Sequence, residues 1–359
     1  MNDHLRSVIT GTGSYLPDRK VTNEDFLGHQ FYESTGERIT KSNQYIIDKF
    51  HEITTIKERR YVNKDQVTSD IAFLAAKKAV KSADVDVETL DYIIVAHNFG
   101  DVVHGTNRTD MVPSLAARVK YMLKIINPDC IAYDLPFGCP GWLQAVIQAD
   151  YFIRSGDAKK ILVIGAETIS RVIDPHDRDS MIYADGAGAT ILEAGEQGEN
   201  GLIAHKTRSD TYKYSQMLKM GSSYNKQNGF VNDIYLKMNG RRLYQYALET
   251  VPKAIMACLE KSKIDITEVK KILIHQANGK MDDAILERLY SLYGIDDAPS
   301  DVMPMIISWS GNSSVATIPT LLDLILKGKM QKHKIEEDDV VVFASVGAGM
   351  NINAAVYRF

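Results

Sequence analysis

The sequence of 359 residues has few cysteines and no long hydrophobic run. Its three cysteines, Cys130, Cys139 and Cys258, have no CxxC spacing, which argues against a disulfide framework and indicates no metal site. No apolar stretch approaches the roughly 20 residues that a membrane-spanning helix needs, and residues 1–6 are charged rather than apolar. We therefore expect a cytoplasmic protein that does not associate with a membrane.

A strong charge of either sign is also missing. The chain has 42 Lys and Arg against 46 Asp and Glu, a formal net charge of -4 and a pI near 6.2. A general nucleic-acid binder carries a broad positive field, so we expect no nucleic-acid partner and favour chemistry on small molecules. Hydrophobic residues make up 45% of the chain and are spread evenly, which at this length predicts two closely packed halves.

The chain contains two matching pairs of segments. Residues 85–95 align without gaps on residues 264–274, and Asp86 coincides with Asp265. Residues 138–154 align without gaps on residues 311–327, which pairs Cys139 with Asn312 and Asp150 with Asp323. The alternative is a chance resemblance between ordinary helix–strand units, and two independent ungapped matches argue against it.

Both matching pairs alternate helical and strand patterns. An amphipathic or buried helix pattern leads in each case to a short apolar strand, as at 161–164 and 340–343. This alternation predicts an α/β protein built from two duplicated halves, which we place at residues 1–195 and 196–359.

Cys139 stands where a strand pattern gives way to a helix pattern, within Gly138-Cys139-Pro140-Gly141. The N-terminus of a helix stabilises a thiolate, the form of cysteine that attacks carbonyl carbons. Pro140 suits the start of a helix because its missing N–H would have no partner there. A buried, inert thiol is the ordinary alternative, and we assign that role to Cys130 and Cys258.

Two polar residues occupy comparable positions in the second half. His275 ends an apolar strand, and the carboxyl ends of strands are where ligand sites gather in α/β sheets. Asn312 lies between Gly311 and Ser313 and, taken alone, is explained by helix capping. The repeat places Asn312 opposite Cys139, and this favours a shared site.

Two glycine-containing segments are weaker signals. Residues 345–350 join two C-terminal strands, and their glycines would allow backbone N–H groups to point into a site as an oxyanion hole. A plain turn between strands would also contain glycine. For residues 185–189, close packing at the centre of the fold is a better explanation than phosphate binding.

The ordered set of motifs resembles the β-ketoacyl-acyl-carrier-protein synthase III family across essentially the whole chain. The matching motifs are Ile56-Lys57-Glu58-Arg59-Arg60, Cys139 with its helix, Asp174-Pro175 through Arg178, Asp185-Gly186-Ala187-Gly188-Ala189, His275-Gln276-Ala277-Asn278 and Gly311-Asn312-Ser313-Ser314. The resemblance implies a five-layered αβαβα thiolase-like fold, a homodimer and a catalytic triad of Cys139, His275 and Asn312.

The resemblance also implies a decarboxylative Claisen condensation. Cys139 would accept an acyl group from a thioester, with the backbone N–H groups of Cys139 and Ala348 as oxyanion hole. A malonyl thioester on acyl carrier protein would then receive hydrogen bonds from His275 and Asn312, lose carbon dioxide and attack the acyl-cysteine. No cofactor is expected, because phosphopantetheine of the carrier protein or of coenzyme A carries the substrates.

Some positions bear on which substrates and partners are used. Family members primed by coenzyme A have a tryptophan and an arginine just before the Ile-Arg-Glu-Arg motif, and residues 49–55 lack both. Lys280 matches the basic residue that docks the acidic carrier protein, and the candidates to extend that patch are Arg241, Arg242, Lys270 and Lys271. On its own, each of these extending charges is better explained as part of a solvated helix face.

Three other functions remain open. The departures just described suit a secondary-metabolite enzyme that joins or cyclises β-ketoacyl chains into resorcinol- or polyketide-type products. A non-catalytic ketosynthase partner would have lost the nucleophile, so the presence of Cys139, His275 and Asn312 argues against it. A cysteine hydrolase uses the same residue types in the same chain order, but the repeat disfavours it.

Overall fold

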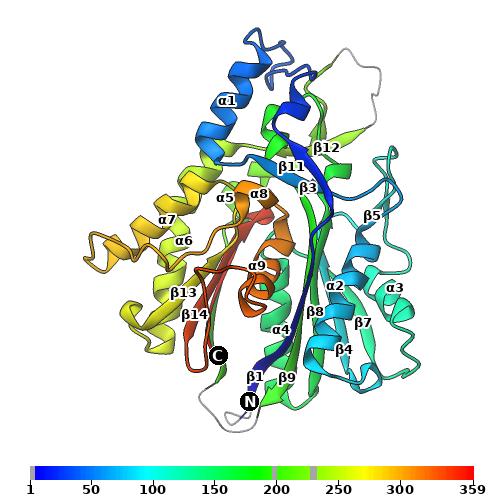
Figure 1. The fold of residues 1–359 in the computed structure, drawn as a ribbon, viewed down its shortest axis with the longest axis vertical. Helices are drawn as coiled ribbons and strands as arrows, with labels where there is room; N and C mark the ends of the chain where they lie inside the picture. Colours follow the sequence, from blue (N-terminus) through cyan, green and yellow to red (C-terminus); the bar gives the residue numbers. More distant parts are fainter. Residues whose placement is uncertain (1–4, 196–199, 227–232) are drawn as a thin grey trace.

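In the computed structural model, which describes residues 5–195, 200–226 and 233–359, two β-sheets face each other across a pair of helices (Figure 1). The first sheet has the strand order β1-β9-β8-β4-β7 and the second has the order β10-β15-β14-β13. Their bounds are β1 (Arg6–Tyr15), β4 (Tyr92–His97), β7 (Ile131–Pro136), β8 (Lys160–Thr168), β9 (Asp185–Gly195), β10 (Gly201–Ser209), β13 (Val269–Ile274), β14 (Val340–Gly347) and β15 (Asn351–Arg358).

The helices form three layers around these two sheets. The central layer is α4 and α9, which are buried on nearly every face because a sheet covers each side. One outer layer, α2 and α3, covers the first sheet, and the other, α6 and α7, covers the second. Their bounds are α2 (Thr68–Ala83), α3 (Leu115–Met122), α4 (Gly141–Ser155), α6 (Gly240–Ser262), α7 (Gly279–Leu292) and α9 (Thr317–Leu326).

The predicted five-layered αβαβα arrangement is therefore present, and the repeat is visible in its topology. β1, β9, β8 and β4 have the same order and relative directions as β10, β15, β14 and β13. Asp86 and Asp265, matched in the sequence, each accept a hydrogen bond from the backbone N–H two residues later, at the start of a short 3₁₀ helix (Val87–Thr89 and Ile266–Glu268). The strands of each sheet lie within one predicted half, whereas the division into domains at 195/196 stays a prediction, since residues 196–199 lie outside the described chain.

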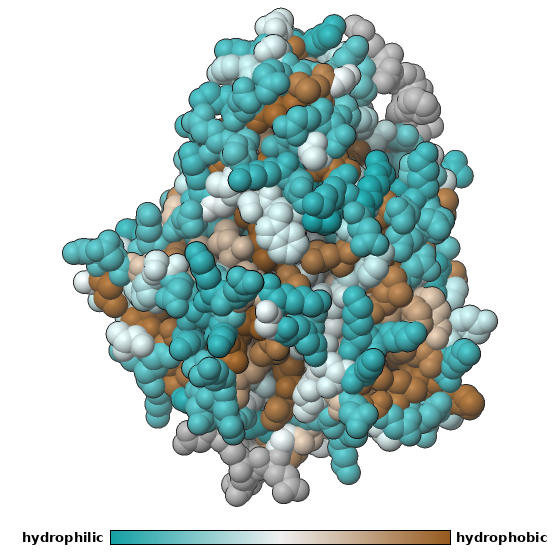
Figure 2. Space-filling view, in the orientation of Figure 1, coloured by the Kyte–Doolittle hydropathy of each residue, from teal (hydrophilic) through white to brown (hydrophobic). Residues whose placement is uncertain are grey.

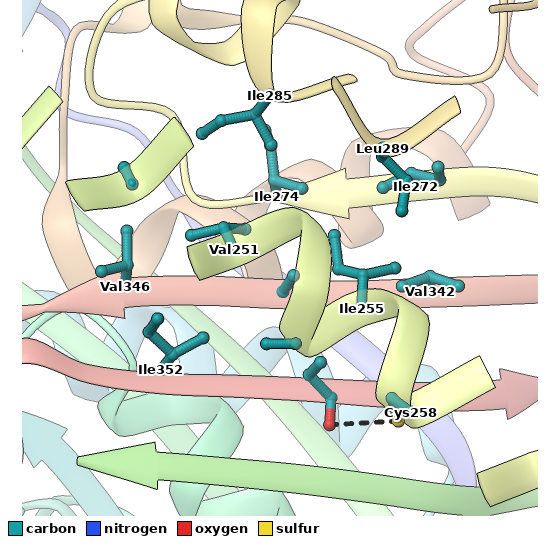
Figure 3. Packing of buried hydrophobic residues seen from close by; sticks show 14 of the residues in the cluster. Val251, Ile255, Cys258, Ile272, Ile274, Ile285, Leu289, Val342, Val346 and Ile352 are labelled. Carbon is teal, nitrogen blue, oxygen red and sulfur yellow. Dashed lines mark hydrogen bonds between the residues drawn. The ribbon is translucent and has the colours of Figure 1, made fainter. Parts of the chain in front are cut away.

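The second outer layer shows why Cys258 is inert. Figure 3 shows Val251, Ile255 and Cys258 of α6 packed on the β-strands that carry Val342 and Ile352. The Cys258 thiol is fully buried and donates weak hydrogen bonds to the carbonyls of Ala354 and Ala204, and burial raises its pKa to about 12. Cys258 is thus a core residue, as the sequence predicted.

A smaller lobe closes one end of the two sheets. It contains α1 (Asn43–Thr54), the strand pair β2 (Arg19–Thr22) and β3 (Glu58–Tyr61), and the strand pair β11 (Leu218–Ser222) and β12 (Ile234–Met238). Fully buried Arg59 of β3 ties segments of this lobe together, because its guanidinium donates to the carbonyls of Val21 and Met181 and to Asn23 Oδ1. Two short helices, α5 (Thr211–Tyr214) and α8 (Ile307–Ser310), and the pair β5 (Asp101–Val102) and β6 (Thr109–Asp110) complete the fold.

The outer surface is mainly hydrophilic. Figure 2 shows teal residues over most of the visible face, with apolar patches on the lobe that contains α1 and beside the first sheet. Among the described residues no helix combines the length and apolar character needed to cross a bilayer.

Gly188 of β9 allows the sheet to lie directly on the central helix α9. A Cβ atom at this position would stand 2.7 Å from Pro319 and from the backbone N of Thr320, well inside van der Waals contact. Close packing is thus the role of this segment, as expected from the sequence. We expect Gly188→Ala to lower the free energy of unfolding by about 1–3 kcal/mol, the usual cost of overpacking.

Urea denaturation of Gly188→Ala beside Gly28→Ala measures this effect. Gly28 is exposed and a Cβ there meets no atom within 4 Å, so its variant should stay within about 0.5 kcal/mol of wild type. Equal stability of the two variants would show that the sheet is not tightly packed on α9.

Candidate active site

Cys139 lies in the tight turn between β7 and α4. Gly138 has a φ of 71°, a left-handed conformation that suits glycine, and its carbonyl accepts the N–H of Gly141 at 2.9 Å. Pro140 immediately precedes the first helical residue, Gly141, rather than lying inside the first turn. Cys139 is partly exposed, whereas Cys130 and Cys258 are buried.

The Cys139 thiol is held in its neutral form. Surrounding protein atoms raise its pKa from 9.0 to about 11, and a hydrogen bond from Ser314 Oγ, 3.2 Å from Sγ, only partly offsets this. A helix N-terminus stabilises a nearby anion by about 0.3–1 kcal/mol at the surface and by up to about 2 kcal/mol where it is partly buried. The rise of the Cys139 pKa from 9.0 to about 11 corresponds to about 3 kcal/mol against the anion, which is larger. The expectation of a helix-stabilised thiolate is therefore wrong, because burial is the larger effect.

Asn312 builds the turn that faces Cys139. Its backbone N–H donates to the carbonyl of Ile182 at 2.9 Å, and its Oδ1 accepts the N–H of Ser314 at 2.8 Å. This bond supports a left-handed φ of 52° at Ser314, an unfavourable conformation for a residue with a side chain. Within the described chain Asn312 Nδ2 donates to no acceptor, so it remains available to a substrate oxygen.

His275 follows β13, and its backbone N–H donates to the carbonyl of Ala344 on β14 at 2.9 Å. Burial lowers the pKa of the imidazole to about 4, and a contact with the Ser314 backbone opposes this shift only weakly. The ring is therefore neutral at physiological pH, and its Nδ1 has no hydrogen-bond partner among the described residues. Ser314 thus contacts all three predicted catalytic residues: its hydroxyl bonds Cys139, its backbone N–H bonds Asn312, and its backbone also bonds His275.

The predicted oxyanion residues also come together. A Cβ at Gly138 would lie 3.0 Å from the backbone N of Ala348, and one at Gly347 would lie 2.7 Å from the backbone N of Cys139. Gly347 is extended, with φ -167°, so it is needed for this close approach and not for a positive φ, whereas Gly349 does adopt a φ of 77°. The Ala348 and Cys139 N–H groups therefore belong to two backbone segments in direct contact.

Two residues that the sequence did not single out complete the surroundings of Cys139. Asn98, next after β4, donates from Nδ2 to Ser314 Oγ at 3.2 Å. Glu167, near the end of β8, accepts from both Asn98 N and Asn98 Nδ2. Their positions at strand ends were the available signal, but nothing in the sequence indicated that they meet Ser314.

A cavity of about 690 Å³ opens between α1, α6 and α7. It reaches Ile182, whose carbonyl binds Asn312, and Ala277, two residues beyond His275, although Cys139 itself does not line it. Its walls are mainly apolar, and its charged lining residues are Glu33, Lys41, Lys49, Arg178, Asp179 and Arg241. A space of this size is typical of small-molecule sites.

The predicted docking residues are only partly grouped. Lys280 and Arg241 are exposed near the N-termini of α7 and α6, and Arg241 also lines the cavity. Arg242 is exposed beside it but does not line the cavity. Lys271, a candidate to extend the patch, is instead buried and paired with Asp301 at 3.2 Å, so it is excluded from any docking surface.

Comparison with known proteins places the whole chain among condensing enzymes. Residues 133–211 match the family model described as 3-oxoacyl-[acyl-carrier-protein (ACP)] synthase III, and residues 259–359 match the model of its C-terminal part. The chain is 32% identical to a β-ketoacyl-[acyl-carrier-protein] synthase III of Bradyrhizobium sp., over 99% of both chains. It is 30% identical to the protein of that name in Xanthomonas campestris pv. campestris, over 100% of both.

Solved structures agree with the sequence comparison. The crystal structure of 3-oxoacyl-[acyl-carrier-protein] synthase III from Aquifex aeolicus superposes with a TM-score of 0.79 and 29% identity, covering 98% of this chain and 100% of the other. The likeness therefore includes both sheets and the central helices that carry the candidate site.

Proposed function

The chain belongs to the 3-oxoacyl-[acyl-carrier-protein] synthase III family of carbon–carbon bond-forming acyltransferases, and we propose that Cys139 is its nucleophile, assisted by His275 and Asn312. The observation that carries this assignment is that Cys139 and His275, from distant parts of the chain, both contact Ser314 in the turn that Asn312 supports. The activity proposed is condensation of an acyl thioester with malonyl-acyl carrier protein in the cytoplasm.

In the first half-reaction, the Cys139 sulfur attacks the thioester carbonyl carbon. Because Cys139 is protonated at rest, its proton has to leave as the carbon–sulfur bond forms, and the neutral imidazole of His275 can accept it. The departing thiol of the carrier takes that proton back. The N–H groups of Cys139 and Ala348 stabilise the tetrahedral oxyanion, a contribution of about 3–4 kcal/mol for one such donor.

In the second half-reaction, a malonyl thioester replaces the departed carrier. Its thioester oxygen accepts hydrogen bonds from His275 and from the Asn312 amide, which has no protein acceptor in the described chain. Loss of carbon dioxide leaves an enolate, whose carbon attacks the acyl-Cys139 carbonyl and expels the sulfur as a thiolate. That thiolate takes up a proton from solvent to restore the resting thiol. Uncharged donors suit this step because they stabilise the developing negative charge without the cost of burying a charge beforehand.

Substrates would enter through the cavity between α1, α6 and α7. A mainly apolar wall whose charged lining residues are four basic and two acidic side chains suits a phosphopantetheine arm, whose chain is neutral and whose phosphate is anionic. No cofactor other than this carried arm is part of the proposal. The carrier protein itself would dock on Lys280, Arg241 and Arg242, since such carriers are acidic.

A homodimer is part of the same proposal. β7 is the last strand of the first sheet and is exposed or half-exposed along its whole length. Exposed apolar residues lie on and around it: Tyr121, Ile126 and Ile131. An open strand edge with apolar neighbours is a ready surface for pairing, and a second copy of the chain would cover it.

Intact-protein mass spectrometry tests the nucleophile. We expect incubation with a panel of acyl-coenzyme A and acyl-carrier thioesters to add one acyl mass to wild type and to Cys130→Ala, but none to Cys139→Ala. Acylated protein should release a longer ketoacyl product after malonyl-carrier is added. Free acid would instead indicate a hydrolase, β-ketoacyl donors alone would indicate the secondary-metabolite alternative, and labelling of Cys139→Ala would refute the assignment.

Charge reversal tests the docking surface. Lys280→Glu and Arg241→Glu should each raise the KM for carrier-linked substrate by about 10-fold or more at low salt, with little change in kcat. The control is Lys253→Glu, an equal charge change on α6 about 18 Å from Arg241. An equal effect of the control, or the same KM change with a short pantetheine thioester, would exclude this docking site.

Sedimentation equilibrium tests the dimer. Wild type should sediment near twice the 40.1 kDa mass of one chain. Ile131→Lys on β7 should shift it towards monomer, whereas Ile234→Lys on β12, an equally exposed isoleucine at 49%, should not. A monomeric wild type would contradict the proposal.

A further inference from the structure

The buried carboxyl of Glu167 is connected to Cys139 by a short chain of hydrogen bonds. Glu167 Oε2 accepts from Asn98 Nδ2 at 2.5 Å, Asn98 Nδ2 also donates to Ser314 Oγ at 3.2 Å, and Ser314 Oγ donates to Cys139 Sγ at 3.2 Å. Glu167 is fully buried, and its other oxygen, Oε1, has no partner among the described residues. The proposed chemistry gives this carboxyl no role.

We propose that Glu167 is a positioning residue, which acts through Asn98 to turn the Ser314 hydroxyl towards the Cys139 sulfur. The inference rests on the proposed role of Cys139 as nucleophile. It adds two residues, Glu167 and Asn98, whose hydrogen bonds reach the sulfur through the Ser314 hydroxyl.

The direction of every bond in the chain follows from Glu167. A carboxylate oxygen that faces a side-chain amide and a backbone N–H can only accept, so the Asn98 side chain must present Nδ2 to it. The same Nδ2 also donates to Ser314 Oγ, so the Ser314 oxygen acts as the acceptor in that bond. The Ser314 proton is left to donate to Cys139, and donation to sulfur favours the thiolate.

The hydrogen bond from Ser314 lowers the pKa of Cys139, whereas the negative charge of Glu167 raises it. Burial raises the pKa of Glu167 to about 7, the hydrogen bonds from Asn98 and the charge of His97 on β4 lower it, and Asp185 on β9 raises it. Ionised Glu167 in turn raises the pKa of Cys139. Since Oε2 can accept from Asn98 in either state, protonation at the free Oε1 removes the charge and keeps the relay.

The two effects predict how Cys139 reactivity changes with pH. Below pH 7 Glu167 is neutral, and above pH 7 it becomes an anion that makes the sulfur harder to deprotonate. The rate of thiol alkylation should therefore rise less than 10-fold per pH unit between about pH 6 and 8 in wild type. Outside that interval it should rise by the full 10-fold while Cys139 remains mostly protonated.

Alkylation of Cys139 by iodoacetamide, followed by peptide mass spectrometry, measures this directly and does not require acyl transfer. Glu167→Gln keeps an acceptor for Asn98 but removes the charge. We expect it to alkylate about 3- to 10-fold faster than wild type at pH 8 and to show the full 10-fold slope throughout. Glu167→Leu and Asn98→Leu lose the relay and should alkylate at least about 5-fold more slowly than Glu167→Gln.

Glu193→Gln is the matched control, because Glu193 lies on the neighbouring strand β9 and bonds Thr10 and Lys160 instead. Its profile should coincide with that of wild type. If Glu167→Leu and Asn98→Leu, folded by circular dichroism, alkylate as fast as Glu167→Gln, the proposed positioning role of Glu167 is overturned. A wild-type profile for Glu167→Gln would overturn the effect of the Glu167 charge. If all variants alkylate as expected here but wild type forms no acyl adduct with any thioester, the result would count against the proposed function and leave this inference standing.

Discussion

The candidate site depends on the close contact of two backbone turns, one before each central helix. The turn at Gly138 precedes α4, and the left-handed turn at Ser314 precedes α9. Both helices are covered by sheets on two sides, so neither turn can move without disturbing the core. The two turns meet where Ser314 Oγ donates to Cys139 Sγ, and the end of β14 packs on the same place, since a side chain at Gly347 would overlap Cys139 and Pro140.

The repeat explains why such different residues meet at these turns. Two equivalent helices begin next to this contact, and the same structural position supplies the proposed nucleophile, Cys139, in one half and the amide of Asn312 in the other. The carboxyl ends of β4, β8 and β13 deliver Asn98, Glu167 and His275 to the same region, as parallel strands in α/β sheets do. Each half alone would present only part of this arrangement.

The duplicated architecture and the three central site residues could be predicted from the sequence, because repeated segments and motifs encode them. The ungapped matches predicted the duplicated α/β architecture, and the pairing of Asp150 with Asp323 has a structural counterpart: both are buried on the central helices and accept hydrogen bonds from hydroxyls of β1. Cys139, His275 and Asn312 each had an ordinary structural explanation when taken alone, and the repeat together with the family resemblance predicted that they share a site. In the structure all three lie next to Ser314.

The rest depended on tertiary contacts that no local pattern encodes. The role of Ser314 arises from a hydrogen bond across 175 positions of the chain, and serine next to asparagine at a helix start ordinarily indicates capping alone. Lys271 was expected on a solvated helix face, whereas it lies on β13, buried and paired with Asp301. The pKa of Cys139 depends on how completely the surrounding chain excludes water, which the start of a helix does not reveal.

Burial also gives the site its electrostatic character. At neutral pH the Cys139 thiol and the His275 imidazole are both uncharged, the first because its pKa is raised to about 11 and the second because its pKa is lowered to about 4. A preformed thiolate–imidazolium pair in this position would carry a large desolvation cost. In the proposed reaction, charge therefore develops only when a substrate carbonyl is present to receive it. The backbone N–H groups proposed to stabilise that charge are fixed in place by the same packing that keeps the resting site neutral.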